Sequence, residues 1–139
     1  MITINFQELY SERLKSIIED HDQKNPLFLY VPLQTPHIPY TVPEEYLDLY
    51  PNEEDLSRKT LLGMVTFMDD VIGALVTNLK SKDMYENSII VFVSDNGGSR
   101  YNGGVGSNLP LRGGKFTVYE GGIRTPAFIH GPKFIPKSG

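Results

Sequence analysis

Three short segments of this chain carry side chains that could bind an ion or move a proton. The first is Gln34–Pro39, in which prolines on both sides of His37 restrict the backbone around the imidazole. A histidine held in this way can act as an acid or a base. Taken alone, however, the segment fits a surface histidine in a turn better than a catalytic one.

The second segment is Ser94–Gly98, which places a carboxylate and an amide side by side at Asp95 and Asn96. Oxygen ligands of this kind suit a hard cation such as calcium, and the glycines that follow let the backbone bend around an ion. The same letters also form a common turn, because Asn-Gly favours turns. Two oxygens fall short of the roughly 6–8 that calcium takes, so a metal site needs further ligands.

The third segment runs from Leu111 to Arg124 and places Arg112, Lys115 and Arg124 among glycines. Cations beside a backbone that allows close approach could bind sulfate or phosphate. Solvated charges in a polar loop are the simpler interpretation of this pattern. The remaining histidines, His21 and His130, fit structural or solvated roles better than chemical ones.

Apolar periodicity predicts the elements that position these segments. Intervals of three and four predict helices, and short apolar runs bounded by turn residues predict buried strands. The expected order is a helix over 7–22, a strand over 27–33, a helix from Pro43 to near Tyr50, a helix over 55–80, a strand over 88–94, a loop over 97–122 and a short strand over 125–129.

The strand, long helix, strand order predicts an α/β fold with a parallel pair and a right-handed crossover. Ligands bind outside the carboxyl ends of strands in such sheets. His37 and Asp95 each follow a predicted strand, so both positions favour a binding site.

Composition limits the classes of function. The 139 residues are enough for one domain or part of one, and a net charge of −4 gives no basic stripe for nucleic acid. The absence of cysteine excludes disulfides and thiolate metal sites. We find no targeting sequence, no Asn-x-Ser/Thr glycosylation site and no stretch approaching the ~20 apolar residues of a membrane span.

Four ordered segments resemble the sulfatase family, in particular sulfatases of the arylsulfatase B type. They are PLFLYVPLQTPHIPYTVPEEYL, GMVTFMDDVIGAL, IIVFVSDNGG and LPLRGGKFTVYEGGIRTPAF, and together they cover nearly the whole chain. The resemblance implies part of an alkaline-phosphatase-like sandwich, with a mainly parallel sheet flanked by helices. Residues 1–139 would then be a partial catalytic domain of a calcium-dependent sulfuric ester hydrolase.

The resemblance also implies roles for single residues. Asp95 and Asn96 correspond to calcium ligands, whereas His37 and Lys115 correspond to residues that bind the sulfate ester and assist catalysis. His37 would protonate the departing alkoxide, and Lys115 would stabilise the negative charge on the sulfate oxygens.

The family's nucleophile is a formylglycine made in a C/S-x-P-x-R motif, which this sequence lacks, as it lacks the aspartate pair that completes the calcium site. We therefore expect an internal piece of a sulfatase that is inactive alone and marginally stable or prone to aggregate. A non-catalytic binding module from a truncated gene, or a related phosphoesterase, are the alternatives. The expected substrate is a sulfated carbohydrate or an aryl sulfate, and the family implies a lysosomal or secreted location; the oligomeric state stays open.

Overall fold

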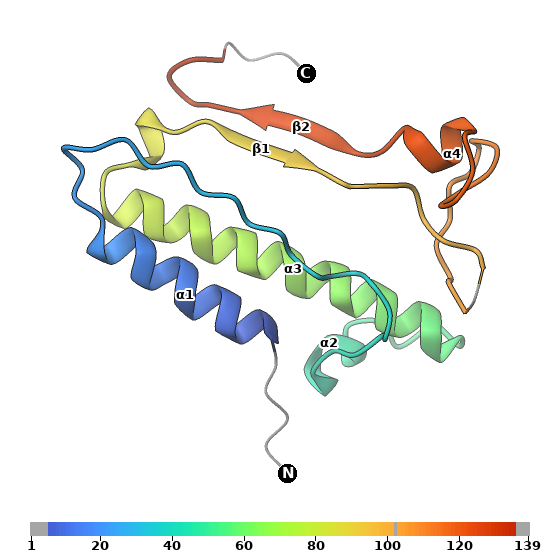
Figure 1. Cartoon of the computed structure of the whole chain (residues 1–139). Coiled ribbons are helices and arrows are strands. Elements are labelled where there is room, and N and C mark those ends of the chain that lie inside the picture. Colours follow the sequence, from blue (N-terminus) through green and yellow to red (C-terminus); the bar gives the residue numbers. More distant parts are fainter. Residues whose placement is uncertain (1–5, 102, 136–139) are drawn as a thin grey trace.

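The computed structural model of the chain describes residues 6–101 and 103–135. Its elements are α1 (Phe6–Asp20), α2 (Glu44–Asp48), α3 (Leu56–Ser81), the 3₁₀ helix η1 (Tyr85–Asn87), β1 (Ile90–Val93), α4 (Glu120–Ile123) and β2 (Ala127–His130). Part of the amino-terminal segment in which we found no targeting sequence lies outside the described residues. Figure 1 shows α1 and α3 side by side below the strand pair.

The long helix α3 is the element on which the others pack. It begins where the sequence predicts, because the Asp55 carboxylate accepts hydrogen bonds from the amides of Ser57 at 2.8 Å and Arg58 at 3.1 Å. Leu14 of α1 meets Phe67 and Val71 of α3 in the hydrophobic core, and Ile18 is fully buried. The predictions for α1, α2 and α3 are therefore confirmed to within two residues at each end.

The predicted strand over 27–33 is wrong as a strand. The segment is extended and runs along α3 in the same direction as β1 (Figure 1), but it pairs with no strand among residues 6–101 and 103–135. Its alternate residues Leu29, Val31 and Leu33 pack against the core. Burial on α3 therefore accounts for the apolar pattern that predicted a strand.

The predicted parallel pair is also wrong for the described residues. The sheet there has two antiparallel strands, with Ile90 of β1 opposite His130 of β2 and Val93 opposite Ala127. A groove of about 2740 Å³, with residues of α3 in its wall, separates the extended segment from β1. Among the described residues, no hydrogen bond joins the segment to β1. Helices with a small sheet agree with part of an α/β fold, whereas a mainly parallel sandwich is not present in the described part.

In the described part of the chain, one edge of β1 faces this groove without a strand partner. The Ser94 amide donates to the Pro126 carbonyl at 3.1 Å, which fixes the positions that pair with β2. Because hydrogen-bonded positions alternate in an antiparallel ladder, Val91 and Val93 direct their backbone groups away from β2. An unpaired edge with apolar side chains is a template for association.

We expect the chain to associate as its concentration rises, and Val91→Lys to shift it toward monomer. Val91 is 63% exposed, and a lysine on a strand edge opposes pairing between chains. Size-exclusion chromatography with light scattering over a concentration series would measure the change. Leu49→Lys is the matched control, because Leu49 is 59% exposed near the end of α2 and gains the same charge far from the edge. Equal effects of the two variants would contradict an association through β1.

Helix α3 is long and apolar enough to cross a membrane by length and composition, whereas the sequence analysis found no stretch approaching a membrane span. The core helix of a soluble protein passes the same test. Six residues of α3 are buried, and the helix packs against both α1 and α2. Of its most apolar window of 18 residues, 28% is buried, so this packing covers only part of the apolar surface.

Candidate functional site

The Ser94–Gly98 segment leaves the end of β1 and is held by its own hydrogen bonds. The Ser94 hydroxyl donates to the Asn96 carbonyl at 3.0 Å, and the Thr125 hydroxyl donates to the Ser94 carbonyl at 3.0 Å. The side-chain nitrogen Nδ2 of Asn96 donates to the Gly97 carbonyl at 2.9 Å, which orients the side-chain oxygen away from that carbonyl. Asp95 is exposed and lines the groove.

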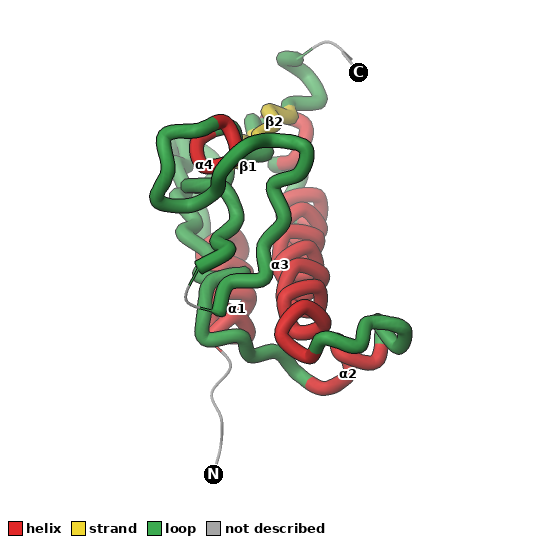
Figure 2. Tube along the Cα trace, turned by 90° about the vertical axis from the view of Figure 1, so that its right-hand side faces the viewer, coloured by secondary structure: helices red, strands yellow, loops and turns green. Residues whose placement is uncertain are grey.

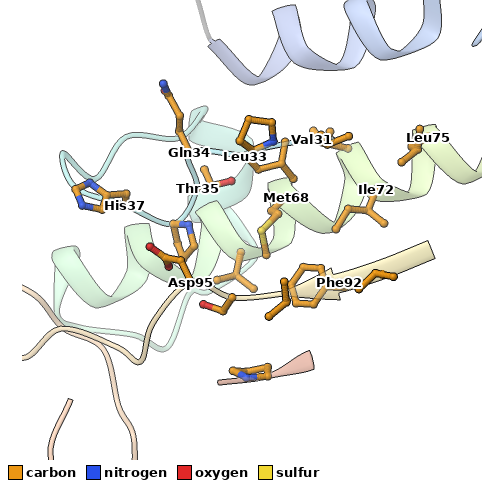
Figure 3. Close-up of a pocket in the computed structure, with 18 of the residues that line it drawn as sticks. Val31, Leu33, Gln34, Thr35, His37, Met68, Ile72, Leu75, Phe92 and Asp95 are labelled. Atoms are coloured by element: carbon orange, nitrogen blue, oxygen red, sulfur yellow. The ribbon is translucent and has the colours of Figure 1, made fainter. Parts of the chain in front are cut away.

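His37 lies in the loop between the extended segment and α2. Its amide donates to the Gln34 carbonyl at 2.9 Å, and its Nδ1 lies 2.6 Å from the Ile38 carbonyl. The Thr35 hydroxyl is buried and has no hydrogen-bond partner among the described residues, so a polar group bound here would find a donor. Figure 3 shows His37 and Asp95 at the same end of the groove, with Met68, Ile72 and Leu75 of α3 further along it.

Lys115 reaches this end of the groove from the glycine-rich loop, 78 positions along the chain from His37. Its amide donates to the Gly98 carbonyl at 3.2 Å, and its Nζ lies 3.4 Å from His37 Nε2. Figure 2 views the molecule from this end, where loops face the viewer. The structure thus brings together two of the residues that the sequence singled out separately.

The contacts of His37 determine which ring nitrogen carries the hydrogen. The Ile38 carbonyl can only accept, so the 2.6 Å contact requires a hydrogen on Nδ1. The Lys115 ammonium can only donate, so it meets the lone pair of Nε2. An anion placed between the two side chains would accept from both and would allow Nε2 to carry a proton. The pair is therefore suited to binding an oxyanion.

The other cations of the loop are used differently. The Arg112 guanidinium lies 3.9 Å from the centroid of the Tyr119 ring, and Arg124 lies 3.7 Å from the Glu120 carboxylate. His21 Nε2 donates to the Asn25 carbonyl at 3.0 Å, and His130, at the end of β2, contacts the Tyr85 hydroxyl at 2.7 Å. Arg112 and Arg124 thus have other partners, and Lys115 is the cation of this loop that lies beside His37.

The proposed calcium site has ligands of the right kind but too few of them among the described residues. Asp95 and Asn96 offer carboxylate and amide oxygens, which are the ligands that calcium prefers. In residues 6–101 and 103–135, no three His, Cys, Asp or Glu side chains gather closely enough to hold a metal ion. The donors fit calcium, and the rest of the roughly 6–8 ligands have to come from elsewhere.

The sequence analysis missed Asn108, whose side chain contacts the backbone of both loops that carry the site. An asparagine in a loop rich in glycine and serine looks like an ordinary turn residue. Its near neighbours in the sequence, Leu109-Pro110-Leu111, give no sign of this role. The signal lies in contacts that only the folded chain forms.

Comparison with known proteins gives consistent matches. The Sulfatase family model matches residues 5–138. Arylsulfatase J of Mus musculus is 41% identical over 125 residues, covering 90% of this chain and 21% of that protein, and N-acetylgalactosamine-6-sulfatase of Mus musculus is 31% identical over 137 residues, covering 94% and 25%. A crystal structure of Ps i-CgsB in complex with k-i-k-neocarrahexaose superposes with a TM-score of 0.90 at 37% identity, covering 96% of this chain and 30% of that chain. The chain thus spans between a fifth and a third of the length of these relatives.

Proposed function

Because this chain belongs to the sulfatase family, we propose that the end of its groove binds the sulfate group of a sulfate ester. The observation that carries the proposal is the 3.4 Å contact between Lys115 Nζ and His37 Nε2. Two nitrogen groups that converge on one point at the surface offer hydrogen bonds to a tetrahedral oxyanion. The sulfatase match supports sulfate as that oxyanion.

Hydrolysis of a sulfate ester breaks the bond between sulfur and the ester oxygen, and the departing oxygen needs a proton. His37 is the residue we assign to this step, because its Nε2 faces the anion position while Nδ1 is engaged by the Ile38 carbonyl. Lys115 would hold the sulfate oxygens as negative charge develops. Both residues thus bind the substrate and assist the reaction.

We assign Asp95 and Asn96 to the protein's calcium site. Their oxygens sit at the carboxyl end of β1 and line the same groove as His37. When bound, calcium would neutralise charge on the sulfate group. The remaining ligands, and the formylglycine nucleophile that the family uses, have no counterpart in this sequence. We therefore propose that this chain is part of a catalytic domain and that, alone, it binds sulfate without hydrolysing it. The alternative is a non-catalytic binding module or pseudoenzyme from a truncated sulfatase gene.

The relatives guide the proposed substrate class. Arylsulfatase J, N-acetylgalactosamine-6-sulfatase and a complex with neocarrahexaose are among the matches. We propose a sulfated carbohydrate or an aryl sulfate as the substrate of the whole protein, and a lysosomal or secreted location. A phosphate monoester would present the same tetrahedral oxygens to His37 and Lys115, so phosphate is the comparison that the test has to include.

The test is a titration of the chain with sulfate in which the NMR signals of the histidine rings are monitored. The chain has three histidines, so His21 and His130 serve as internal controls. We expect the His37 ring signals to shift saturably, with a Kd on the order of 1 mM for an exposed site with two contacts. Chloride at matched ionic strength should leave them in place.

Two outcomes would count against this function. One is a response of all three histidines alike, which would indicate nonspecific binding. The other is a shift of His37 with phosphate but not with sulfate, which would favour a phosphoesterase. Addition of an aryl sulfate, with no release of the phenol, would support the expected lack of hydrolysis by the chain alone.

A further inference from the structure

We propose that Asn108 is a positioning residue, which fixes Lys115 against the segment that carries Asp95 and Asn96. The proposal deepens the proposed function and rests on it. The evidence for it is the set of hydrogen bonds that the half-buried Asn108 side chain makes.

Asn108 uses both ends of its amide on the same residue. Its Oδ1 accepts from the Gly98 amide at 2.7 Å, and its Nδ2 donates to the Gly98 carbonyl at 2.8 Å. A backbone amide only donates and a carbonyl only accepts, so this pairing fixes the orientation of the side chain. Gly98 closes the segment that contains Asp95 and Asn96.

The same side chain also reaches the loop that carries Lys115. Nδ2 makes a further contact of 3.2 Å with the Gly113 carbonyl, two residues before Lys115. The Gly98 carbonyl then accepts from both the Asn108 side chain and the Lys115 amide, the latter at 3.2 Å. One carbonyl is thus the common anchor of Asn108 and Lys115.

The backbones of the two loops approach closely around this anchor. A Cβ on Gly114 would lie 2.6 Å from the Gly98 carbonyl oxygen and 2.8 Å from Asn108 Nδ2. The two loops therefore touch through backbone, and the Asn108 amide joins them by hydrogen bonds to Gly98 and Gly113. Loss of the side chain would free the Lys115 loop to move relative to Asp95.

The proposal predicts that Asn108→Ala weakens sulfate binding about tenfold in the titration monitored at His37, since the three hydrogen bonds that the side chain makes with neutral backbone groups are lost. Ser99→Ala is the matched control. The Ser99 hydroxyl also bonds to backbone in this loop, donating to the Tyr101 carbonyl at 3.1 Å and accepting from the Tyr101 amide. In the described part of the chain it makes no hydrogen bond to Gly98 or Gly113. We expect it to change the affinity less than twofold.

A double-mutant cycle separates positioning from a general loss of structure. If Asn108 acts through Lys115, Asn108→Ala has no further effect on sulfate affinity in a chain that already carries Lys115→Ala. An undiminished effect in that background would overturn the proposal, as would equal losses in the Asn108 and Ser99 variants. Asn108→Asp covers the case in which the alanine variant does not fold. It keeps the bond to the Gly98 amide, faces two carbonyl oxygens with a carboxylate, and should also weaken binding.

Hydrogen exchange gives a readout that does not depend on sulfate. We expect the amides of Gly98 and Lys115 to lose protection in Asn108→Ala, while the amide of Phe67 in α3 keeps it. If the natural chain binds no sulfate, the proposed function fails, but this loss of protection still supports the role of Asn108 in holding the Lys115 loop. Unchanged protection at Lys115 would overturn that role whether or not sulfate binds.

Discussion

Replacing Lys115 by methionine is expected to weaken sulfate binding by about ten- to a hundredfold, the equivalent of a lost hydrogen bond to a charged group. Methionine keeps an unbranched chain of similar reach but carries no charge and no donor. His37 would then face the anion alone, because the structure places the Lys115 ammonium 3.4 Å from its Nε2. The titration followed at the His37 ring measures the change.

Lys133→Met is the control for charge alone. Lys115 lies 5.4 Å from the ring of Phe116, and Lys133 lies 5.8 Å from the ring of Phe134, so each is a loop lysine beside its neighbouring phenylalanine. The two variants lose the same charge from similar local surroundings. We expect Lys133→Met to change affinity less than twofold, and comparable losses would show that sulfate responds to overall charge rather than to a site.

The helices could be predicted from the sequence because their signals are local. The stripe of apolar residues in α3 and the Asp55 cap that starts it lie within a few residues of one another. The extended segment over 27–33 has an equally clear local pattern, yet it pairs with no strand. Pairing depends on what lies alongside, and there the groove separates the segment from β1. The period of the apolar residues and the length of the segment cannot show which element lies beside it.

In the candidate site, too, local sequence features could be recognised, whereas contacts between distant segments could not. The residue types in the TPH, DNGG and RGGK segments are compatible with an anion and a hard cation, but taken alone the first and third fit surface roles better. The resemblance to sulfatases is what assigned binding roles to them. The contact between His37 and Lys115 joins positions 78 residues apart, and no local rule predicts it. Asn108 was missed for the same reason, because its partners are backbone groups with no side chain to mark them.

The second large effect is expected from Gly97→Ala, which should lower the free energy of unfolding by about 3 kcal/mol or more, the range of backbone clashes in buried positions. Gly97 is buried, and its amide donates to the Gly122 carbonyl at 2.9 Å. A Cβ at this position would strike the Gly121 carbonyl oxygen and lie 2.8 Å from the Gly121 carbonyl carbon. These neighbours are backbone, so relief requires that the Ser94–Gly98 segment and α4 move apart.

Gly73→Ala provides the matched control with the opposite sign. Gly73 lies inside α3, and a Cβ there would meet nothing within 4 Å, so alanine should stabilise the helix by up to about 1 kcal/mol. Urea unfolding followed by circular dichroism compares the two variants. Because Gly97 joins the Asp95 segment to the loop that leads back to β2, its variant should also lose the His37 response to sulfate, whereas Gly73→Ala should keep it. A Gly97 variant that unfolds like the natural chain and still binds sulfate would show that the close approach of these backbones is not needed for the site.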